Sequence, residues 1–189
     1  MLVLKSKRTI VLSGISGIGK STIISELNRT LVFEHLQASA LIQKFFQSKQ
    51  EQNYTSEQLR TGNIEENQIA LSEALKALPS NKNYIFDSHT VIDTPDGLVA
   101  VEPTIFEPAT PKHFIFLFEP PVIIQQRRER DHTRERPERS TEQITEYQNL
   151  ALINCAMIAT HFNVPMTVLS TSKISEIAEL AQNYFTQSM

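Results

Sequence analysis

The 189-residue sequence contains one cysteine, Cys155, and no tryptophan, and only five of its residues are glycine. A single cysteine cannot form an intramolecular disulfide, which is typical of a reducing compartment, and we expect a cytoplasmic protein. No stretch approaches the length of a membrane span, so no membrane partner is expected. The N-terminal apolar residues are interrupted by Lys5, Lys7 and Arg8, and no small-residue cleavage site follows them, which argues against a signal peptide.

The sequence also lacks a basic excess, because its formal net charge is −3 at pH 7. General nucleic-acid-binding proteins usually carry such an excess, so nucleic acid is disfavoured as a partner. Neither repeats nor low-complexity linkers divide the chain, and 40% of its residues are hydrophobic, an ordinary share for a globular protein. We therefore expect a single domain over residues 1–189 with a buried core.

Apolar runs and helical spacing alternate along the chain, with about five segments of each kind. Short β-branched or continuous apolar runs predict strands, and apolar residues three and four positions apart predict helices. The alternation predicts an α/β fold, a doubly wound five-stranded parallel sheet with helices on both faces. The expected strands are 9–14, 33–39, 83–89, 113–119 and 165–170; the expected helices are 20–31, 40–50, 64–78, 120–131, 140–162 and 175–185, with 55–63 as a connection.

Three of the five glycines lie within nine residues, in the stretch GISGIGKST from Gly14 to Thr22. The stretch matches G-x-x-x-x-G-K-[ST] and lies between an expected strand and an expected helix, the context that the phosphate-binding loop requires. Glycines permit positive φ, so backbone N–H groups can turn around an anion at the positive end of the helix. We expect this phosphate loop to bind ATP, with Lys20 on the β- and γ-phosphates, Ser21 on Mg²⁺ and Thr22 on the α-phosphate. The expected ATP-binding residues of the loop are Gly14, Ser16, Gly17, Ile18, Gly19, Lys20, Ser21 and Thr22.

Asp87 ends the expected strand YIFD, at the edge of a parallel sheet where ligands gather. Its carboxylate can hold a water of the magnesium shell, which would make Asp87 and Ser21 the metal-site residues, or it can orient the acceptor. A strand-end aspartate can also simply cap a turn. His89 can contact the phosphate or base of the acceptor, or it can serve the structure alone. The stretch DTPDG, residues 93–97, predicts a turn that shapes a substrate loop.

The segment RRERDHTRERPER, residues 127–139, holds six of the nine arginines together with four acidic residues. It can be a solvated helix end with ion pairs, or a lid that closes over a triphosphate. Arginine grips phosphate oxygens bidentately and neutralises charge in phosphoryl transfer, so the phosphate loop upstream favours a lid over 127–140. We expect Arg134 and Arg136 to lie near the phosphates and to be catalytic residues together with Lys20 and Asp87. Arg127 and Arg130 are expected at the base of the lid or on the adenine. No role is assigned to Arg128 and Arg139.

Arg60 lies in the region 35–78, where a doubly wound kinase carries its acceptor-binding helices. It can bind the phosphate of an acceptor, and a surface arginine without a ligand is the alternative. Elsewhere, the apolar parts of the expected strand 113–119 and helix 140–162 predict core positions rather than a cofactor site. These core positions are Phe114, Phe116 and Phe118 in the strand and Cys155, Met157 and Ile158 in the helix.

Taken together, the motifs resemble the archaeal-type adenylate kinases within the nucleoside monophosphate kinases. YIFDSHTVIDTPDG is similar to a strand of that family that ends in Asp-x-His before a Thr-Pro-x-Gly turn, and RRERDHTRER is similar to its lid. The resemblance implies a P-loop kinase that transfers the γ-phosphate of ATP to AMP with Mg²⁺. It also implies Arg60 on the acceptor phosphate and Arg134 and Arg136 on the transferred group. Some members are oligomers, often trimers, so the resemblance also implies a homo-oligomer.

The sequence departs from this family after the lid, where Leu152 stands at the position of an expected arginine. An acceptor other than AMP therefore stays open, such as another small metabolite or a polynucleotide end. A nucleotide-binding ATPase without kinase activity is a further alternative. The chain lacks the Asn/Thr-Lys-x-Asp motif with which GTPases read guanine, which argues against a GTPase-like switch.

Overall fold

The computed structural model describes residues 7–49, 54–132 and 136–186. Its centre is a five-stranded sheet in the order β2-β3-β1-β6-β7, in which every neighbouring pair is parallel. The α/β doubly wound fold expected from the sequence is therefore confirmed. The strands of this sheet are β1 (Arg8–Ser13), β2 (Glu34–Gln37), β3 (Asn83–Asp87), β6 (Pro111–Leu117) and β7 (Met166–Leu169).

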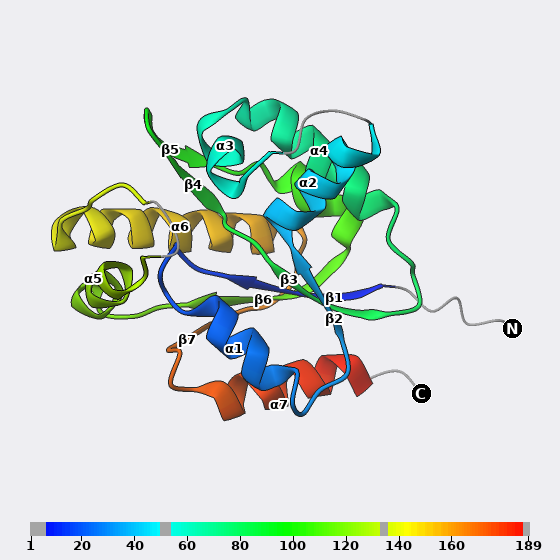
Figure 1. Ribbon diagram of the computed structural model, residues 1–189. Coiled ribbons are helices and arrows are strands. Elements are labelled where there is room, and N and C mark those ends of the chain that lie inside the picture. The colour runs from blue at the N-terminus through cyan, green and yellow to red at the C-terminus, as the bar shows by residue number, and fades with distance from the viewer. Residues whose placement is uncertain (1–6, 50–53, 133–135, 187–189) are drawn as a thin grey trace, which may run out of the picture.

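Helices cover both faces of the sheet (Figure 1). On one face α1 and α7 lie together, and on the other face α2, α4 and α6 lie over the strands. Among the described residues, no helix has both the length and the apolar character that a membrane crossing would need. The helices are α1 (Lys20–Leu27), α2 (Ala38–Ser48), α3 (Ser56–Thr61), α4 (Ile64–Lys76), α5 (Pro121–Arg130), α6 (Thr141–His161) and α7 (Ile174–Thr186).

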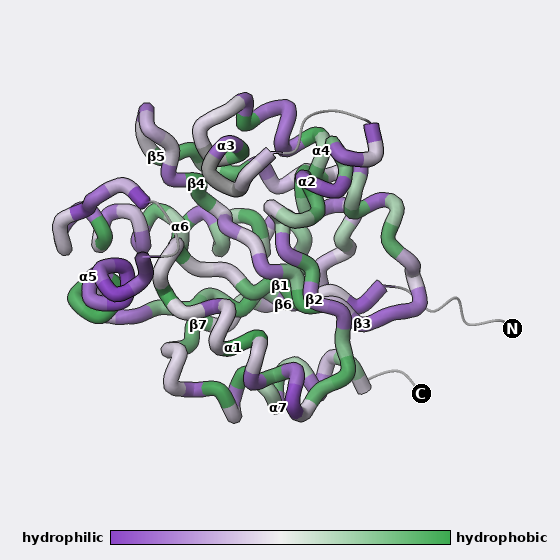
Figure 2. The backbone as a smooth tube through the Cα atoms, viewed as in Figure 1, coloured by the Kyte–Doolittle hydropathy of each residue, from purple (hydrophilic) through white to green (hydrophobic). Residues whose placement is uncertain are grey.

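The core is built on the central strands, which Figure 2 colours as hydrophobic while α5 is largely hydrophilic. Phe86 and Phe114 are fully buried on β3 and β6, and each ring lies 5.9 Å from the ring of Phe106. Phe116 is also buried and Phe118 packs against the core, so the expectation for this strand is confirmed.

In α6 the expectation for the core is only partly right. Cys155 and Ile158 are buried, and burial raises the pKa of the Cys155 thiol to about 12, which makes this thiol inert. Met157 is 62% exposed, so its expected place in the core is wrong. At 3.6 residues per turn, Met157 lies about 200° around the helix from Cys155, on the solvent side.

Two parts of the fold were not expected. The connection 55–63 contains the short helix α3, which starts with a capping box: Gln58 N–H donates to Thr55 Oγ1 at 3.1 Å, and Thr55 N–H donates to Gln58 Oε1 at 2.7 Å. The turn predicted at 93–97 closes an antiparallel hairpin of β4 (Val91–Thr94) and β5 (Gly97–Ala100), followed by the 3₁₀ helix η1 (Pro103–Ala109).

The helix α1 is shorter than expected. The sequence predicts a helix over 20–31, but α1 ends at Leu27.

Candidate functional site

A cavity of about 960 Å³ opens at the carboxyl ends of the parallel strands. The phosphate loop follows β1, Asp87 ends β3 and Gln37 ends β2, so three neighbouring strands deliver residues to one edge of the sheet. The helices of the α2–α4 region form one wall and the residues around α5 the other. Its described lining includes residues 15–22, Gln37, Asp87, His89, Arg127, Arg128, Arg136 and Tyr147.

Apolar anchors and glycines shape the phosphate loop. Ile15 and Ile18 are buried in the core and tie the loop to the strands below it. Gly19 stands at the N-cap of α1 with φ +108° and gives no capping side chain, so the first amides of the helix are not satisfied by a cap. This is the arrangement that favours an anion at a helix N-terminus.

Lys20 lies on the floor of the cavity, and its side chain is only 7% exposed. Its Nζ donates to Gly14 O at 2.8 Å and lies 3.8 Å from Asp87 Oδ1. His89 Nδ1 also donates to Gly14 O at 2.8 Å and comes within 3.4 Å of the lysine Nζ. The structure therefore brings Lys20, Asp87 and His89 together, as strand-end positions predict.

Asp87 is ionised in this setting although it is buried. Burial by itself would raise its pKa, but the charge of Lys20 and the contacts of His35 and His89 outweigh burial and hold the pKa below its ordinary value. His35 belongs to the edge strand β2, and its Nε2 lies 3.9 Å from Asp87 Oδ2. No sequence motif includes His35, so its contact with Asp87 is visible only in the structure.

Ser16 accepts hydrogen bonds from two arginines that are distant in the sequence. Arg128 of α5 donates from Nε to Ser16 O at 3.0 Å, and Arg136 donates from Nε to Ser16 Oγ at 3.1 Å. The hydroxyl of Tyr147, on α6, lies near the Ser16 backbone amide and donates to Val91 O of the hairpin β4–β5 at 3.2 Å. Ser16 thus binds the phosphate loop to α5 and to the segment around Arg136.

Arg128 has unused hydrogen-bonding capacity beside the phosphate loop. Its Nη1 and Nη2 are buried and have no hydrogen-bond partner among the described residues, while its guanidinium lies 6.0 Å from the ring centre of Tyr147. Burial lowers the pKa of Arg128, Tyr147 and Asp93 raise it, and the charges of Arg136 and Arg139 lower it again. Two buried donors without a partner are costly unless an acceptor approaches them, so this surrounding fits a phosphate group.

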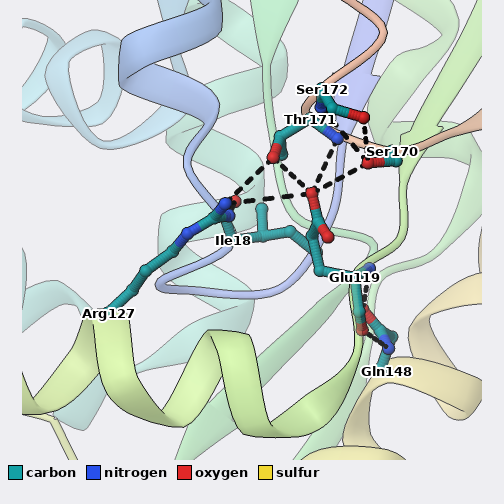
Figure 3. A network of polar contacts seen from close by, with 7 residues as sticks. All are labelled: Ile18, Glu119, Arg127, Gln148, Ser170, Thr171 and Ser172. Carbon is teal, nitrogen blue, oxygen red and sulfur yellow. Dashed lines mark hydrogen bonds and ion pairs between the residues drawn. The ribbon is translucent and has the colours of Figure 1, made fainter.

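On the opposite side of the loop, Arg127 joins the phosphate loop to the turn after β7 (Figure 3). It donates from Nη1 to Ile18 O and from Nη2 to Thr171 Oγ1, the latter at 3.1 Å. Glu119, after β6, accepts from Thr171 N–H at 2.8 Å and from both hydroxyls of Ser170 and Thr171. Burial would raise the pKa of Glu119, but these hydrogen bonds and the charge of Arg127 hold it below its ordinary value.

Gln148, on α6, holds the backbone of Glu119 in place. Its side chain is fully buried, accepts from Glu119 N–H at 3.1 Å and donates to Glu119 O at 2.8 Å. The amide thus satisfies both backbone groups of Glu119 where β6 has ended and no strand partner remains. Glu119 and the turn 170–172 are consequently fixed relative to the phosphate loop.

Ion pairs hold Arg136 to the end of α5 and Arg139 to the hairpin. Arg136 Nη2 pairs with Asp131 Oδ2, and Arg139 Nη2 lies 2.7 Å from Asp93 Oδ1, where the carboxylate is only 6% exposed. Arg139, to which the sequence assigned no role, therefore connects the start of α6 to β4. Asp93 lines the cavity, so Arg139 meets the turn predicted at 93–97 at the edge of this cavity.

The described side chains with which α2, α3 and α4 line the cavity are apolar, with a few uncharged polar groups. Asn67 is buried and donates from Nδ2 to Leu59 O at 2.7 Å, which fixes the orientation of its amide. This lining suits the non-phosphate part of a small acceptor better than a phosphate. Its described residues are Ser39, Ile42, Leu59, Ile64, Asn67, Gln68 and Leu71.

Some of the expected site residues are elsewhere. Arg130 is exposed at the end of α5 and is not among the cavity-lining residues, and Leu152 packs against the core. Arg134 lies outside the described residues, and only the backbone of Arg60, in α3, is described. His89 faces Lys20 rather than the acceptor wall. Arg128, Tyr147, Glu119 and Thr171 were missed because their contacts with the loop span long sequence separations.

Comparison with known proteins agrees with this geometry. Residues 13–145 match the family model described as AAA domain. An adenylate kinase of Thermococcus kodakarensis is 24% identical over 183 residues, which cover 90% of this chain and 89% of that protein. An adenylate kinase of Thermoplasma volcanium is 26% identical over 151 residues, which cover 74% of this chain and 77% of that protein. These relatives confirm the resemblance inferred from the motifs.

Solved structures share the fold at low sequence identity. A shikimate kinase from Acinetobacter baumannii, in complex with shikimate, superposes with a TM-score of 0.60 at 13% identity, covering 96% of this chain and 94% of that chain. The YorR protein from Bacillus subtilis, in complex with phosphorylated GDP, gives a TM-score of 0.54 at 16% identity, covering 96% and 99%. These likenesses establish the architecture of P-loop kinases for this chain.

Proposed function

Because the chain belongs to the AAA domain family and has the fold of P-loop kinases, we propose that it transfers the γ-phosphate of ATP to a nucleoside monophosphate, with AMP as the leading acceptor. The resemblance to archaeal-type adenylate kinases, supported by two relatives at 24% and 26% identity, favours AMP.

The observation that carries the proposal is the convergence of positive groups on one loop. Lys20 lies beneath the loop, while Arg128 and Arg136 both reach Ser16 from above it. The two Nη groups of Arg128 are buried without partners, an arrangement that a phosphate oxygen would satisfy. Phosphoryl transfer depends on positioning and charge neutralisation, so this cluster fits a kinase better than a turn that binds nothing.

The residues present also fit Mg²⁺. When bound, Mg²⁺ would neutralise charge on the phosphates. Ser21 offers a hydroxyl and Asp87 an ionised carboxylate, which are the oxygen ligands that Mg²⁺ prefers, directly or through water. Among the described residues no group of three His, Cys, Asp or Glu side chains could hold a metal, so the ion would depend on the phosphates for its remaining ligands.

The residues then divide the work of transfer. Lys20 provides charge at the β- and γ-phosphates, and Arg128 and Arg136 provide it on the other side of the transferred group. Asp87 orients the attacking oxygen of the acceptor or a magnesium-bound water, and its lowered pKa keeps it ionised at neutral pH. The turn 170–172, fixed by Glu119, forms the border of the site near Arg127, where we place the nucleotide base. Arg60 and Arg134 remain proposed contacts of the acceptor phosphate and the transferred group.

One observation favours a second candidate, a kinase of an uncharged small metabolite. The described side chains from α2, α3 and α4 that line the cavity are apolar or uncharged. Arg60 decides between the two candidates, since it is the cation that the resemblance assigns to the acceptor phosphate. Arg60→Ala should raise the KM for a nucleoside monophosphate by about tenfold or more and leave the KM for an uncharged acceptor within about twofold.

An acceptor screen tests the proposal directly. The protein is incubated with ATP and Mg²⁺ and with each of the nucleoside monophosphates, shikimate or simple polyols, and products are followed by phosphorus NMR. We expect ADP and one nucleoside diphosphate to form together in equal amounts. A phosphorylated polyol instead would move the function to the second candidate, and phosphorylated shikimate, whose carboxylate is charged, would reject both candidates. ATP hydrolysis that no acceptor changes would remove the kinase proposal altogether.

A further inference from the structure

Ser16 occupies the third position of the phosphate loop, G-I-S-G-I-G-K-S, and its hydroxyl points to the lid rather than to the helix that follows the loop. Arg136 donates from Nε to this hydroxyl at 3.1 Å, and the Arg136 side chain is only 11% exposed. The same guanidinium pairs through Nη2 with Asp131, at the end of α5. Two fixed partners on different segments thus determine where the Arg136 guanidinium lies.

The contacts of Ser16 separate cleanly into backbone and side-chain contacts. Arg128 binds its carbonyl oxygen and Tyr147 interacts with its amide, and both contacts would survive a change of side chain. The hydroxyl has one described partner in the lid, the Nε of Arg136. A substitution that removes only the hydroxyl should therefore loosen Arg136 and leave Arg128, Tyr147 and the course of the loop in place.

The charges near Ser16 explain why a hydroxyl is useful there. Burial lowers the pKa of Arg128, Tyr147 and Asp93 raise it, and the charge of Arg136 lowers it again, so the guanidinium groups of Arg128 and Arg136 repel each other. Without fixed partners, the Arg136 side chain would move away from Arg128. Its hydrogen bonds to Ser16 and Asp131 oppose that movement. Holding the arginine in place before the reaction saves the reorganisation that would otherwise accompany charge development.

We propose that Ser16 is a positioning residue whose hydroxyl holds Arg136 of the lid over the phosphate loop for phosphoryl transfer. This inference rests on the proposed kinase function and changes the role of Ser16 from a phosphate contact to a docking point for the lid. The hydroxyl acts on the reaction only through Arg136. The effect of removing it must therefore disappear when Arg136 is also removed.

Ser16→Ala, Arg136→Gln and the double variant test this dependence in steady-state kinetics with the acceptor found in the screen. We expect Ser16→Ala to lower kcat by about tenfold and to leave the KM for ATP within about twofold, since a hydrogen bond to a charged group is lost but the loop persists. Ser16→Thr, which keeps a hydroxyl, should retain most of the activity. Ser48→Ala is the matched control, because the exposed Ser48 hydroxyl bonds only to Phe45 O in its own helix.

The double variant gives the decisive comparison. We expect Ser16→Ala to change kcat by less than about twofold when it is added to Arg136→Gln, since coupled residues are not additive. The proposal would be wrong if the two substitutions lowered kcat by independent factors that multiply in the double variant. It would also be wrong if Ser16→Ala raised the KM for ATP and left kcat unchanged, because Ser16 would then be a phosphate contact.

Trypsin provides a readout that does not depend on the reaction. Ser16→Ala should speed cleavage after Arg130 and Arg139 by about fivefold without ATP, because Arg136 leaves the phosphate loop more often. Arg136→Gln removes no cleavage site, since Pro137 follows it, and should act similarly. Unchanged cleavage in Ser16→Ala would refute the docking role even in an active kinase. Faster cleavage in a protein that phosphorylates no acceptor would keep the docking role and reject the proposed function.

Discussion

The Cγ atom of Arg128 lies 2.7 Å from the point that a β-carbon on Gly17 would occupy. The arginine therefore covers the phosphate loop so closely that only glycine fits beneath it. Gly17 also has φ +89°, a conformation that costs an L-residue roughly 1–2 kcal/mol. The absence of a side chain at position 17 is thus a condition for the contact between α5 and the loop.

Gly17→Ala should weaken ATP binding by about tenfold or more, because the new methyl group displaces Arg128 from the loop. Isothermal titration calorimetry measures this affinity, and Gly97→Ala is the matched control. Gly97 has φ +134° but nothing within 4 Å of its β position, so its substitution introduces strain without a clash at the site. Equal losses of ATP affinity in both variants would contradict the fitted contact between Gly17 and Arg128.

Lys20→Ala should lower turnover by about 10²- to 10³-fold, since it removes charge where charge develops in the transition state. It should also raise the pKa of Asp87, because Lys20 is the main group that opposes the effect of burial on that carboxylate. The pH dependence of kcat in the variant, or carbon NMR of the aspartate, reports this rise. Lys82→Ala, which removes an exposed lysine paired with Glu34, should leave both quantities unchanged.

The parts of the fold that were predicted correctly are encoded by contiguous residues. The phosphate loop is one unbroken motif, and the strand that ends in Asp87 is one apolar run, so both are legible locally. The helix α3 was missed although its signature is local, since Thr55 and Gln58 have the spacing of a capping box. Met157 was misplaced because an apolar run does not reveal the phase of a helix.

The side-chain partners of the site could not be read in the same way. Ser16 and Arg136 are separated by 120 positions and meet only because the chain after α5 returns to the phosphate loop. Glu119 joins Thr171 across 52 positions for a similar reason, since both follow the carboxyl ends of neighbouring strands. No periodicity or motif links such pairs, so the sheet order must be known before either contact can be derived.

His113 makes the stability of the fold depend on pH. Its ring is buried beside Tyr184, with Nε2 2.8 Å from Thr167 Oγ1, and burial lowers its pKa from 6.5 to about 4. Between about pH 6.5 and pH 4, His113 therefore binds a proton in the unfolded chain but stays neutral in the folded chain. The contribution of neutral His113 is fully present above about pH 6.5 and is lost as the pH falls towards about 4, an effect of roughly 3 kcal/mol at most.

Urea denaturation between pH 7 and pH 4.5 should show this loss in the wild-type protein. His113→Gln should flatten the fall in the free energy of unfolding over the same range, because the titrating group is gone. His161→Gln, which replaces a half-exposed histidine, should keep the slope of the wild type. A slope that survives in His113→Gln would assign the pH dependence to other groups.

Glu119→Gln tests whether the turn 170–172 is part of the nucleotide site. The substitution removes a charged acceptor of three hydrogen bonds from this turn, while Gln148 still pairs with the backbone of residue 119. We expect the KM for ATP to rise by about fivefold and kcat to fall by less than about twofold, since the lost contacts lie away from Lys20. Glu179→Gln on α7 is the exposed control. A fall in kcat alone would place the turn outside the nucleotide site.

Arg128→Met should stabilise the protein and weaken its hold on ATP at the same time. The substitution loses one hydrogen bond to Ser16 O, worth about 1 kcal/mol, but removes two buried unpartnered donors and a charge beside Arg136. We therefore expect the free energy of unfolding without ATP to rise by about 1 kcal/mol. Thermal unfolding with and without ATP·Mg²⁺ measures both effects, because the shift caused by the nucleotide should shrink in the variant. Arg29→Met, at an exposed arginine paired with Glu26, should preserve the wild-type shift. If Arg128→Met destabilised the protein without ATP and kept the full shift, Arg128 would be a structural arginine and the anion would bind elsewhere.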